Sequence, residues 1–165
     1  MQNPTQIKDI DIGNFWKAIG CRAIGAAVVT AQGDTGPAGF LALSTSHLCA
    51  SPPILMVSVG LDTSASAVIV ESGSFAINFL PKDRKDLSDS FGGKGPLKGA
   101  DRFGPGEWNT LATGAPTLKD AVGVLDCRVE ECIERHRTLI VLGRLVSYAL
   151  VTERDPLIFF AGRMD

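Results

Sequence analysis

The sequence predicts a mainly β protein, an antiparallel barrel with helices at its periphery. Its 165 residues fit one compact domain and are too few for two full ones. The 18 Gly and 9 Pro suit many short strands joined by tight turns. The apolar segments run as a helix, several strands, short helices and more strands, without the alternation of a doubly wound sheet. We therefore expect a single domain over residues 1–165.

The first part of the chain predicts a helix followed by strands. Apolar residues recur at the spacing of one helix face, at Ile12, Phe15, Trp16, Ile19 and Ala23. The apolar runs of residues 24–32 and 38–46 flank a turn rich in Gly, Asp and Pro, which predicts a β-hairpin. The run from Ile54 to Val59 is apolar almost throughout and predicts a strand buried on both faces.

The middle of the chain predicts two short helices around a strand. Residues 62–72 begin with capping residues and become apolar, which indicates a short helix. Residues 74–80 alternate, with Phe75, Ile77 and Phe79 on one face of a strand. Residues 83–91 place Leu87 and Phe91 four positions apart, as on a short amphipathic helix.

A Gly- and Pro-rich segment separates these elements from three later strands. Residues 92–109 predict a loop, and the part from Gly92 to Gly106 is a candidate lid over a binding site or, alternatively, a disordered insertion. The first later strand has Leu125, Cys127, Val129 and Ile133 on one expected face. Residues 137–150 and 155–163 predict the other two strands.

Composition excludes several classes of function. A net charge of −2 excludes a strongly basic nucleic-acid binder, and two His exclude a His-rich metal site. The four cysteines lack CxxC or zinc-ligand spacing and are interpreted as small core or surface residues: Cys21, Cys49, Cys127 and Cys132. No signal core or membrane-length apolar run is found, so we expect a cytoplasmic protein with reduced thiols.

Common catalytic motifs are missing from the sequence. The string GGKGPLKG lacks GxGxxG spacing, and neither a GxxxxGK[ST] loop nor a GxSxG elbow occurs. Cys49 and His47 lie two apart, so on a strand they would share a face. Nothing in the sequence supplies the orienting third group of a nucleophilic site, and we discount this pair.

Three polar segments are candidates for ligand binding. Residues 43–47, Leu-Ser-Thr-Ser-His, put three hydroxyls at a strand end, where a solvated turn is an equal alternative. Residues 62–66 lie at a helix N-terminus, which attracts phosphate, although plain N-capping explains them too. Residues 134–137 form a basic cluster between two strands, suited to an anion or to solvent.

The order of these segments resembles the flavin reductase-like family. The similarity runs from about Phe15 to Arg163 through AGFLALSTSHLCASPPILMVSV, SASAVIVESGSFAINFL, DRFGP, GAPTLKDAVGVLDCRVEECIERHRTLIVLGRLV and LIFFAGR. The resemblance implies the FMN-binding split-barrel fold and a homodimer with flavin near its interface. It also implies hydride transfer from NADH or NADPH to FMN or FAD.

Three roles are open for a protein with this resemblance. The reduced flavin is passed to a partner monooxygenase, or electrons go to a bound metallocofactor such as a corrinoid. The third alternative is a non-enzymatic flavin-binding module. No catalytic side chain is expected in the first case, because the cofactors carry the chemistry.

The flavin-binding residues of the family map onto this chain by motif. The hydroxyl-rich strand ahead of Pro52-Pro53 would line the ring, and Ser64 and Ser66 would contact the phosphate. The full set that the resemblance implies is Leu41, Ala42, Leu43, Ser44, Thr45, Ser46, Ser58, Val59, Ser64, Ala65, Ser66, Phe91 and Arg163.

The nicotinamide side departs from the family pattern. Many members carry Gly-Asp-His before the strand that here ends at Gly143, and a gap-free count puts Thr138 at the His position. His136 lies two residues earlier and would project to the same side of an extended strand. The resemblance thus implies His136, Thr138 and Phe103 on the nicotinamide or substrate side.

Overall fold

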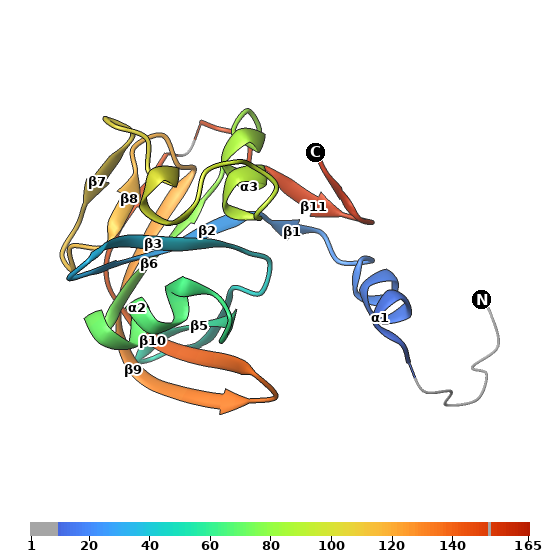
Figure 1. Ribbon diagram of the computed structural model, residues 1–165, viewed down its shortest axis with the longest axis horizontal. Helices are drawn as coiled ribbons and strands as arrows, with labels where there is room; N and C mark the ends of the chain where they lie inside the picture. Colours follow the sequence, from blue (N-terminus) through green and yellow to red (C-terminus); the bar gives the residue numbers. More distant parts are fainter. Residues whose placement is uncertain (1–9, 152) are drawn as a thin grey trace.

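The computed structural model describes residues 10–151 and 153–165, and it is mainly β (Figure 1). Its largest sheet has seven antiparallel strands in the order β3-β2-β6-β9-β10-β5-β4. The bounds are β2 (Ala27–Gly33), β3 (Gly36–Ala42), β4 (Ser46–Ala50), β5 (Pro53–Gly60), β6 (Ser74–Phe79), β9 (Gly123–Arg135) and β10 (Thr138–Leu150). The expected mainly antiparallel β architecture is confirmed.

Two small sheets and three α-helices complete the fold of the described residues. One small sheet joins β1 (Ile24–Gly25), β11 (Ile158–Phe160) and β12 (Arg163–Met164); the other joins β7 (Trp108–Thr110) and β8 (Pro116–Leu118). The helices are α1 (Ile12–Ile19), α2 (Ser64–Ser72) and α3 (Lys85–Phe91), with a 3-10 turn η1 (Gly99–Arg102). No helix in the described ranges is long and apolar enough to cross a membrane.

Helices α2 and α3 cover opposite faces of the sheet near β2 and β3, as Figure 1 shows below and above these strands. Strand β2 is buried on both faces, which explains its continuous apolar run. Val29 packs in the cluster that contains Ile69 of α2. Its neighbour Val28 packs in the cluster that contains Leu87 of α3. Because successive strand residues face opposite ways, one strand serves both cores.

Helix α1 stands away from the sheets (Figure 1) and buries none of its residues. The Asp11 carboxylate caps it by accepting the Asn14 backbone N–H at 2.8 Å. The helix ends at Ile19, and the Gly20 N–H donates to the carbonyl of Trp16. The predicted helix is confirmed over this range, but Ala23 lies beyond its end.

Two predictions about strand faces are wrong for physical reasons. The registers of β9 and β10 shift between Leu142 and Gly143, so Glu130 is an extra, bulged residue. The bulge reverses the side-chain alternation, and Ile133 therefore does not share a face with Cys127. In β5, Val57 and Val59 are buried, but Leu55 on their face and Met56 and Ser58 on the opposite face are only half-buried because they line a cavity.

Gly143 generates the first testable prediction, because its position leaves no room for a side chain. An added Cβ would lie 2.5 Å from Phe75 Cζ and 3.1 Å from Cys127 Cβ, and both neighbours are fully buried. Gly143→Ala should therefore lower the free energy of unfolding by about 1–3 kcal/mol, as overpacking does.

Chemical denaturation measures this effect, with Gly95→Ala as the control. An added Cβ at Gly95 meets only Ser90 Cα at 3.7 Å, an ordinary contact. The control should stay within about 0.5 kcal/mol of the unaltered chain. Equal stability of the two variants would contradict the overpacking at Gly143.

Candidate functional site

Two adjacent cavities lie where the edge of β3 meets the end of β5. The first, the strand-edge cavity, has a volume of about 660 Å³, within the range of small-molecule sites. It is lined by β3, the end of β5, α1, the end of α3 and the residues that follow α3. The second, the sheet-face cavity, has about 720 Å³ and lies against β4, β5, β6 and β9. The residues shared by both are Arg22, Ile24, Leu43, Ser44 and Ser58.

Strand β3 supplies an open edge to the strand-edge cavity. It pairs with β2 on one side and with no other strand of the described chain. Every second residue of such an edge strand directs its N–H and C=O outward. Three residues, 43–45, then lead to β4 at the opposite edge of the sheet, so the two edges must lie within about 14 Å of each other there. The Ser44 hydroxyl donates to the Ser58 carbonyl at 3.2 Å and ties β5 to this connection.

The N-terminal end of α2 lies beside the same cavity. Thr63 lines it as the N-cap, and its hydroxyl makes no capping hydrogen bond. Ser64 is exposed, whereas Ser66 is buried and its hydroxyl donates to the Thr63 carbonyl at 2.8 Å. Within the described residues, the Ser64 and Ala65 N–H groups have no hydrogen-bond acceptor. Backbone N–H groups and the Thr63 and Ser64 hydroxyls are therefore the donors available at this helix end.

An aromatic cluster fixes both ends of the Gly-rich segment. Phe91, the last residue of α3, is 4% exposed and lies 5.2 Å from the Phe103 ring centroid. Trp108, just past the segment, lies 5.9 Å from Phe91 and 4.9 Å from Phe103. Phe91 reaches the strand-edge cavity, while Phe103 lies in the cluster and lines a smaller cavity with Trp108.

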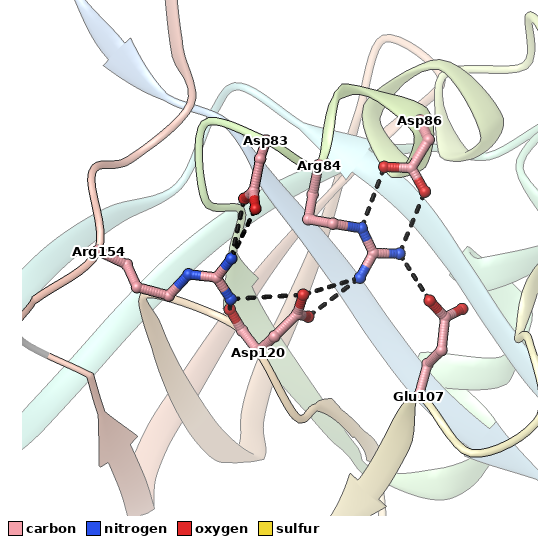
Figure 2. Close-up of polar contacts among 6 residues, drawn as sticks. All are labelled: Asp83, Arg84, Asp86, Glu107, Asp120 and Arg154. Carbon is pink, nitrogen blue, oxygen red and sulfur yellow. Dashed lines mark hydrogen bonds and ion pairs between the residues drawn. The ribbon is translucent and has the colours of Figure 1, made fainter.

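An ion-pair network holds α3 in place (Figure 2). Arg84, just before α3, has a side chain only 14% exposed. It donates to Asp86 in the first turn of α3, to Glu107 at 2.8 Å and to both oxygens of Asp120. Arg154 joins Asp120 from the far side at 3.4 Å. The network thereby connects the start of α3 with the end of the Gly-rich segment.

The same network shifts the pKa values of Arg84 and Asp86. Burial lowers the pKa of the Arg84 guanidinium, but hydrogen bonds and attraction to Asp86 and Asp120 outweigh it and raise the pKa overall. Burial raises the pKa of the Asp86 carboxyl, and its bonds to Arg84 outweigh that and lower it. Arg84 and Asp86 therefore both stay charged at neutral pH.

The cysteines show no sign of nucleophilic chemistry. Burial, followed by the charge of Asp126, raises the pKa of the Cys127 thiol to about 12. The strand register shifts between His47 and Cys49, which face Leu55 and Ile54 respectively. Because these partners are adjacent on β5, His47 and Cys49 point to opposite faces of the sheet.

The charges that line the two cavities are cationic. Arg22 lines both cavities and Arg102 lines the strand-edge cavity, and no Asp or Glu is among the described lining residues of either. Sequence reasoning missed both arginines, since each lies in a connection far along the chain from the predicted binding strand. It also missed the apolar wall that α1 contributes through Phe15, Trp16 and Ile19.

The structure brings together about half of the residues that the sequence singled out. Those on the strand-edge cavity are Leu41, Ala42, Leu43, Ser44, Ser58, Val59 and Phe91. Thr45 and Ser46 line the sheet-face cavity. The residues on neither cavity are Ser64, Ala65, Ser66, Phe103, His136, Thr138 and Arg163.

Several of these residues adjoin a strand or residue that lines the strand-edge cavity. Thr138 is the cross-strand partner of Gly60, which lines the strand-edge cavity. His136 is exposed in the β9–β10 turn with a left-handed φ of 47°. Arg163 lies on β12, one strand away from Phe159 of the cavity wall.

Fold and site together define a class of protein. Apolar walls along an open strand edge suit a flat aromatic ring, which the outward backbone groups can bond at its rim. Hydroxyls, free N–H groups at a helix N-terminus and arginines without nearby acids suit a phosphate. The molecule is thus a mainly β domain with a cavity suited to a phosphorylated aromatic cofactor.

Comparison with known proteins identifies the family. The family model described as "Flavin reductase like domain" matches residues 19–165. The chain therefore belongs to the flavin reductase-like family. The FMN reductase (NADH) RutF of Ancylobacter novellus is 37% identical over 142 residues, which cover 85% of this chain and 77% of that protein.

Solved structures of flavin reductases share the fold. BorF, the flavin reductase component of a bacterial two-component tryptophan halogenase, matches with a TM-score of 0.86 and 25% identity, covering 94% of this chain and 97% of that one. The styrene monooxygenase flavin reductase of Pseudomonas putida matches with a TM-score of 0.79 and 27% identity, covering 92% and 96%.

The Arg84 network yields a stability prediction. Arg84→Gln leaves Asp86, Glu107 and Asp120 without their shared cation, so the free energy of unfolding should fall by about 1–3 kcal/mol. Arg144→Gln is the matched control, because it breaks only the exposed pair with Glu130. It should change stability by less than about 1 kcal/mol in the same denaturation experiment. Equal losses would contradict the network's role.

The effect of Arg84→Gln should also depend on pH. Because the folded-state pKa of Asp86 is lowered, its stabilisation is complete at neutral pH. This stabilisation is lost as the pH falls below about 4, the ordinary pKa of an Asp carboxyl, and then through the lowered pKa of the folded state. The stability difference between Arg84→Gln and the unaltered chain should therefore shrink between pH 7 and pH 3. A difference that stays constant, or grows, would show that Arg84 does not lower the pKa of Asp86.

Proposed function

We propose that this chain is an NADH-dependent flavin reductase whose flavin binds in the strand-edge cavity. The single observation that carries the location is the meeting of the open β3 edge, the N-terminal end of α2 and arginines in one acid-free cavity. Membership of the flavin reductase-like family supports the activity. So does the name of the relative from Ancylobacter novellus, FMN reductase (NADH).

The residues present fit FMN. The ring would lie against Leu41–Ser44, where apolar side chains form the wall and outward backbone groups bond its polar rim. The phosphate would lie at the end of α2, bonded by the Thr63 and Ser64 hydroxyls and by free N–H groups. The buried Ser66 would act indirectly, by holding the Thr63 carbonyl. FAD shares the same ring and first phosphate and would use the same contacts.

The protein's own contribution is orientation and exclusion of water. Bound flavin supplies the chemistry, accepting a hydride from reduced nicotinamide. The described lining of the strand-edge cavity holds no Asp, Glu or His, so no side chain there is suited to general acid–base catalysis. Phe91 and the α1 residues Phe15 and Trp16 wall the cavity with apolar surface, which keeps water from the reacting face.

The cosubstrate would approach from the β9–β10 turn. Thr138 is opposite Gly60, and the Leu61 N–H donates to the Arg137 carbonyl at 3.0 Å, so the turn is held against the cavity's rim. His136 and Thr138 are the proposed nicotinamide-side residues, with NADH favoured by the names of the relatives. Phe103 would act through Phe91, which it contacts. Arg163 would close the far side of the flavin region.

The proposed assembly is a homodimer of split barrels, each one domain of residues 1–165. The short connection between the sheet's two edges supports the barrel. Exposed apolar side chains support the dimer: Tyr148 is 63% and Leu150 62% exposed, and Tyr148 pairs across strands with Leu125 of the sheet-face cavity. A second copy would cover this surface and close the sheet-face cavity.

The proposed cellular role is supply of reduced flavin to a partner monooxygenase. The styrene monooxygenase flavin reductase is of that kind by name, and BorF is named as the flavin reductase component of a two-component halogenase. All four cysteines, each within the described chain, are free thiols, which supports the reducing cytoplasm as location.

Anaerobic spectroscopy tests the activity. Adding NADH to the protein with equimolar FMN should bleach the flavin absorbance, because hydride is transferred to the ring. Flavin that binds but stays oxidised with both NADH and NADPH would contradict the reductase and leave a flavin-binding module.

A charge variant tests the phosphate end. Ser64→Asp places a carboxylate beside the phosphate and should weaken FMN binding at least 10-fold. Val70→Asp adds the same charge to an exposed position of α2 away from its N-terminal end and should leave FMN affinity unchanged. Unchanged FMN affinity in Ser64→Asp would overturn the placement.

Light scattering tests the dimer. The chain of 17.4 kDa should elute with twice that mass, and Tyr148→Asp should shift it toward the monomer, because burial of a charge opposes association. Val70→Asp again serves as the control. A monomeric unaltered chain would contradict the proposed assembly.

A further inference from the structure

In the described chain, most arginine side chains that make a hydrogen bond bind a carboxylate. Arg84, Arg137, Arg144 and Arg154 all form ion pairs. Arg22 and Arg102 are different: both line the strand-edge cavity, and their described partners include no Asp or Glu. Arg102 is the stronger candidate of the two, because it also contacts Phe91. A guanidinium at a cavity wall without a carboxylate partner is free to bind an anionic ligand.

Arg102 is held in position by two contacts that leave its terminal nitrogens free. Its Nε donates to the Leu97 carbonyl at 3.2 Å, and its Cζ lies 5.9 Å from the Phe91 ring centroid. Phe91 is itself buried in the aromatic cluster with Phe103 and Trp108. Both NH₂ groups of the fork therefore remain available, on a side chain that is already ordered.

Among the described residues, no carboxylate forms an ion pair with this guanidinium, and its chain neighbour Asp101 is no exception. Asp89 of α3 pairs with Lys94 at 3.3 Å, and the described lining of the cavity is free of carboxylates. Arg102 reaches the cavity from the α3 face of β3, because η1 and Phe91 lie on that face. Thr63 reaches it from the α2 face. An anion at the strand edge would thus meet donors from both faces.

We propose that Arg102 binds the phosphate on the ribityl chain of the flavin and makes the enzyme select phosphorylated flavins over riboflavin. The proposal rests on the proposed function, since it assumes that flavin occupies the strand-edge cavity. It adds a specificity-determining residue at that site. A planar fork with two free NH₂ groups matches a phosphate, which accepts bonds on several oxygens.

Binding of FMN and riboflavin to matched variants tests the proposal, with flavin fluorescence as the readout. Arg102→Gln should weaken FMN binding about 10- to 100-fold and change riboflavin binding less than 2-fold, because only FMN carries the charge. Arg102→Lys should retain part of the FMN preference. Arg128→Gln, an exposed change on β9 away from both cavities, should alter neither affinity.

Three outcomes would overturn the role of Arg102. Equal losses for FMN and riboflavin would make it a structural residue of the cavity wall. Unchanged affinity for both would remove it from the site. Unchanged FMN affinity with a raised KM for NADH would assign it to the phosphates of the cosubstrate. Failure of the proposed function is distinguishable, because the unaltered protein would then show no NADH-driven reduction of either flavin.

Discussion

The constraint on which the site depends is the open edge of β3. A strand paired on one side leaves alternate N–H and C=O groups without partners, and a protein must cover such an edge or use it. Here the chain places a cavity along it, because residues 43–45 carry the backbone straight from this edge to β4 at the other. The elements that cover the faces of β2 and β3 then become the two flanks of the cavity. In the proposed function, one missing strand partner therefore determines where the flavin binds.

The flank formed by α3 has few regular contacts of its own. Helix α3 has only 7 residues, and the segment that follows it is Gly-rich. Arg84 connects this helix to Glu107 and Asp120 (Figure 2). The aromatic cluster around Phe91 connects it to the far end of the segment. Such cross-links keep a cavity wall in place without additional secondary structure. They also leave Phe91 and Arg102 at fixed positions beside the strand edge.

Charge in this protein matters locally and not as a total. The chain is slightly acidic, at −2, yet the described walls of the strand-edge cavity carry arginines and no carboxylates. The acids gather elsewhere, four of them around Arg84 and Arg154. A low-dielectric cavity lined by one sign of charge concentrates ligands of the other sign. An anionic nucleotide therefore needs no excess of Lys and Arg over the whole chain.

Much of the fold follows from local sequence signals. The hairpin of β2 and β3, helix α2 and strand β6 were predictable from periodicity and turn residues. The run Leu41–Ser44, which lies on one strand and its end, was indicated by the family resemblance. Ile133 was not, because a bulge at Glu130 reverses its face without a signal in composition. Arg22 and Arg102 were not either, since tertiary packing brings them to the cavity from separate connections. The direction of the Ser66 hydroxyl was not predictable for the same reason, because it points inward and donates to the Thr63 carbonyl.

The measurement that tests the central claim most directly is backbone NMR of the isotope-labelled protein during titration with FMN. Our account predicts that the largest shifts occur at the N–H groups of Leu41–Ser44 and of Ser64 and Ala65, where the strand edge and the helix end are free. Shifts confined to the smaller cavity beside Trp108 and Asn109, with an unperturbed β3, would show that the strand edge is not the flavin site.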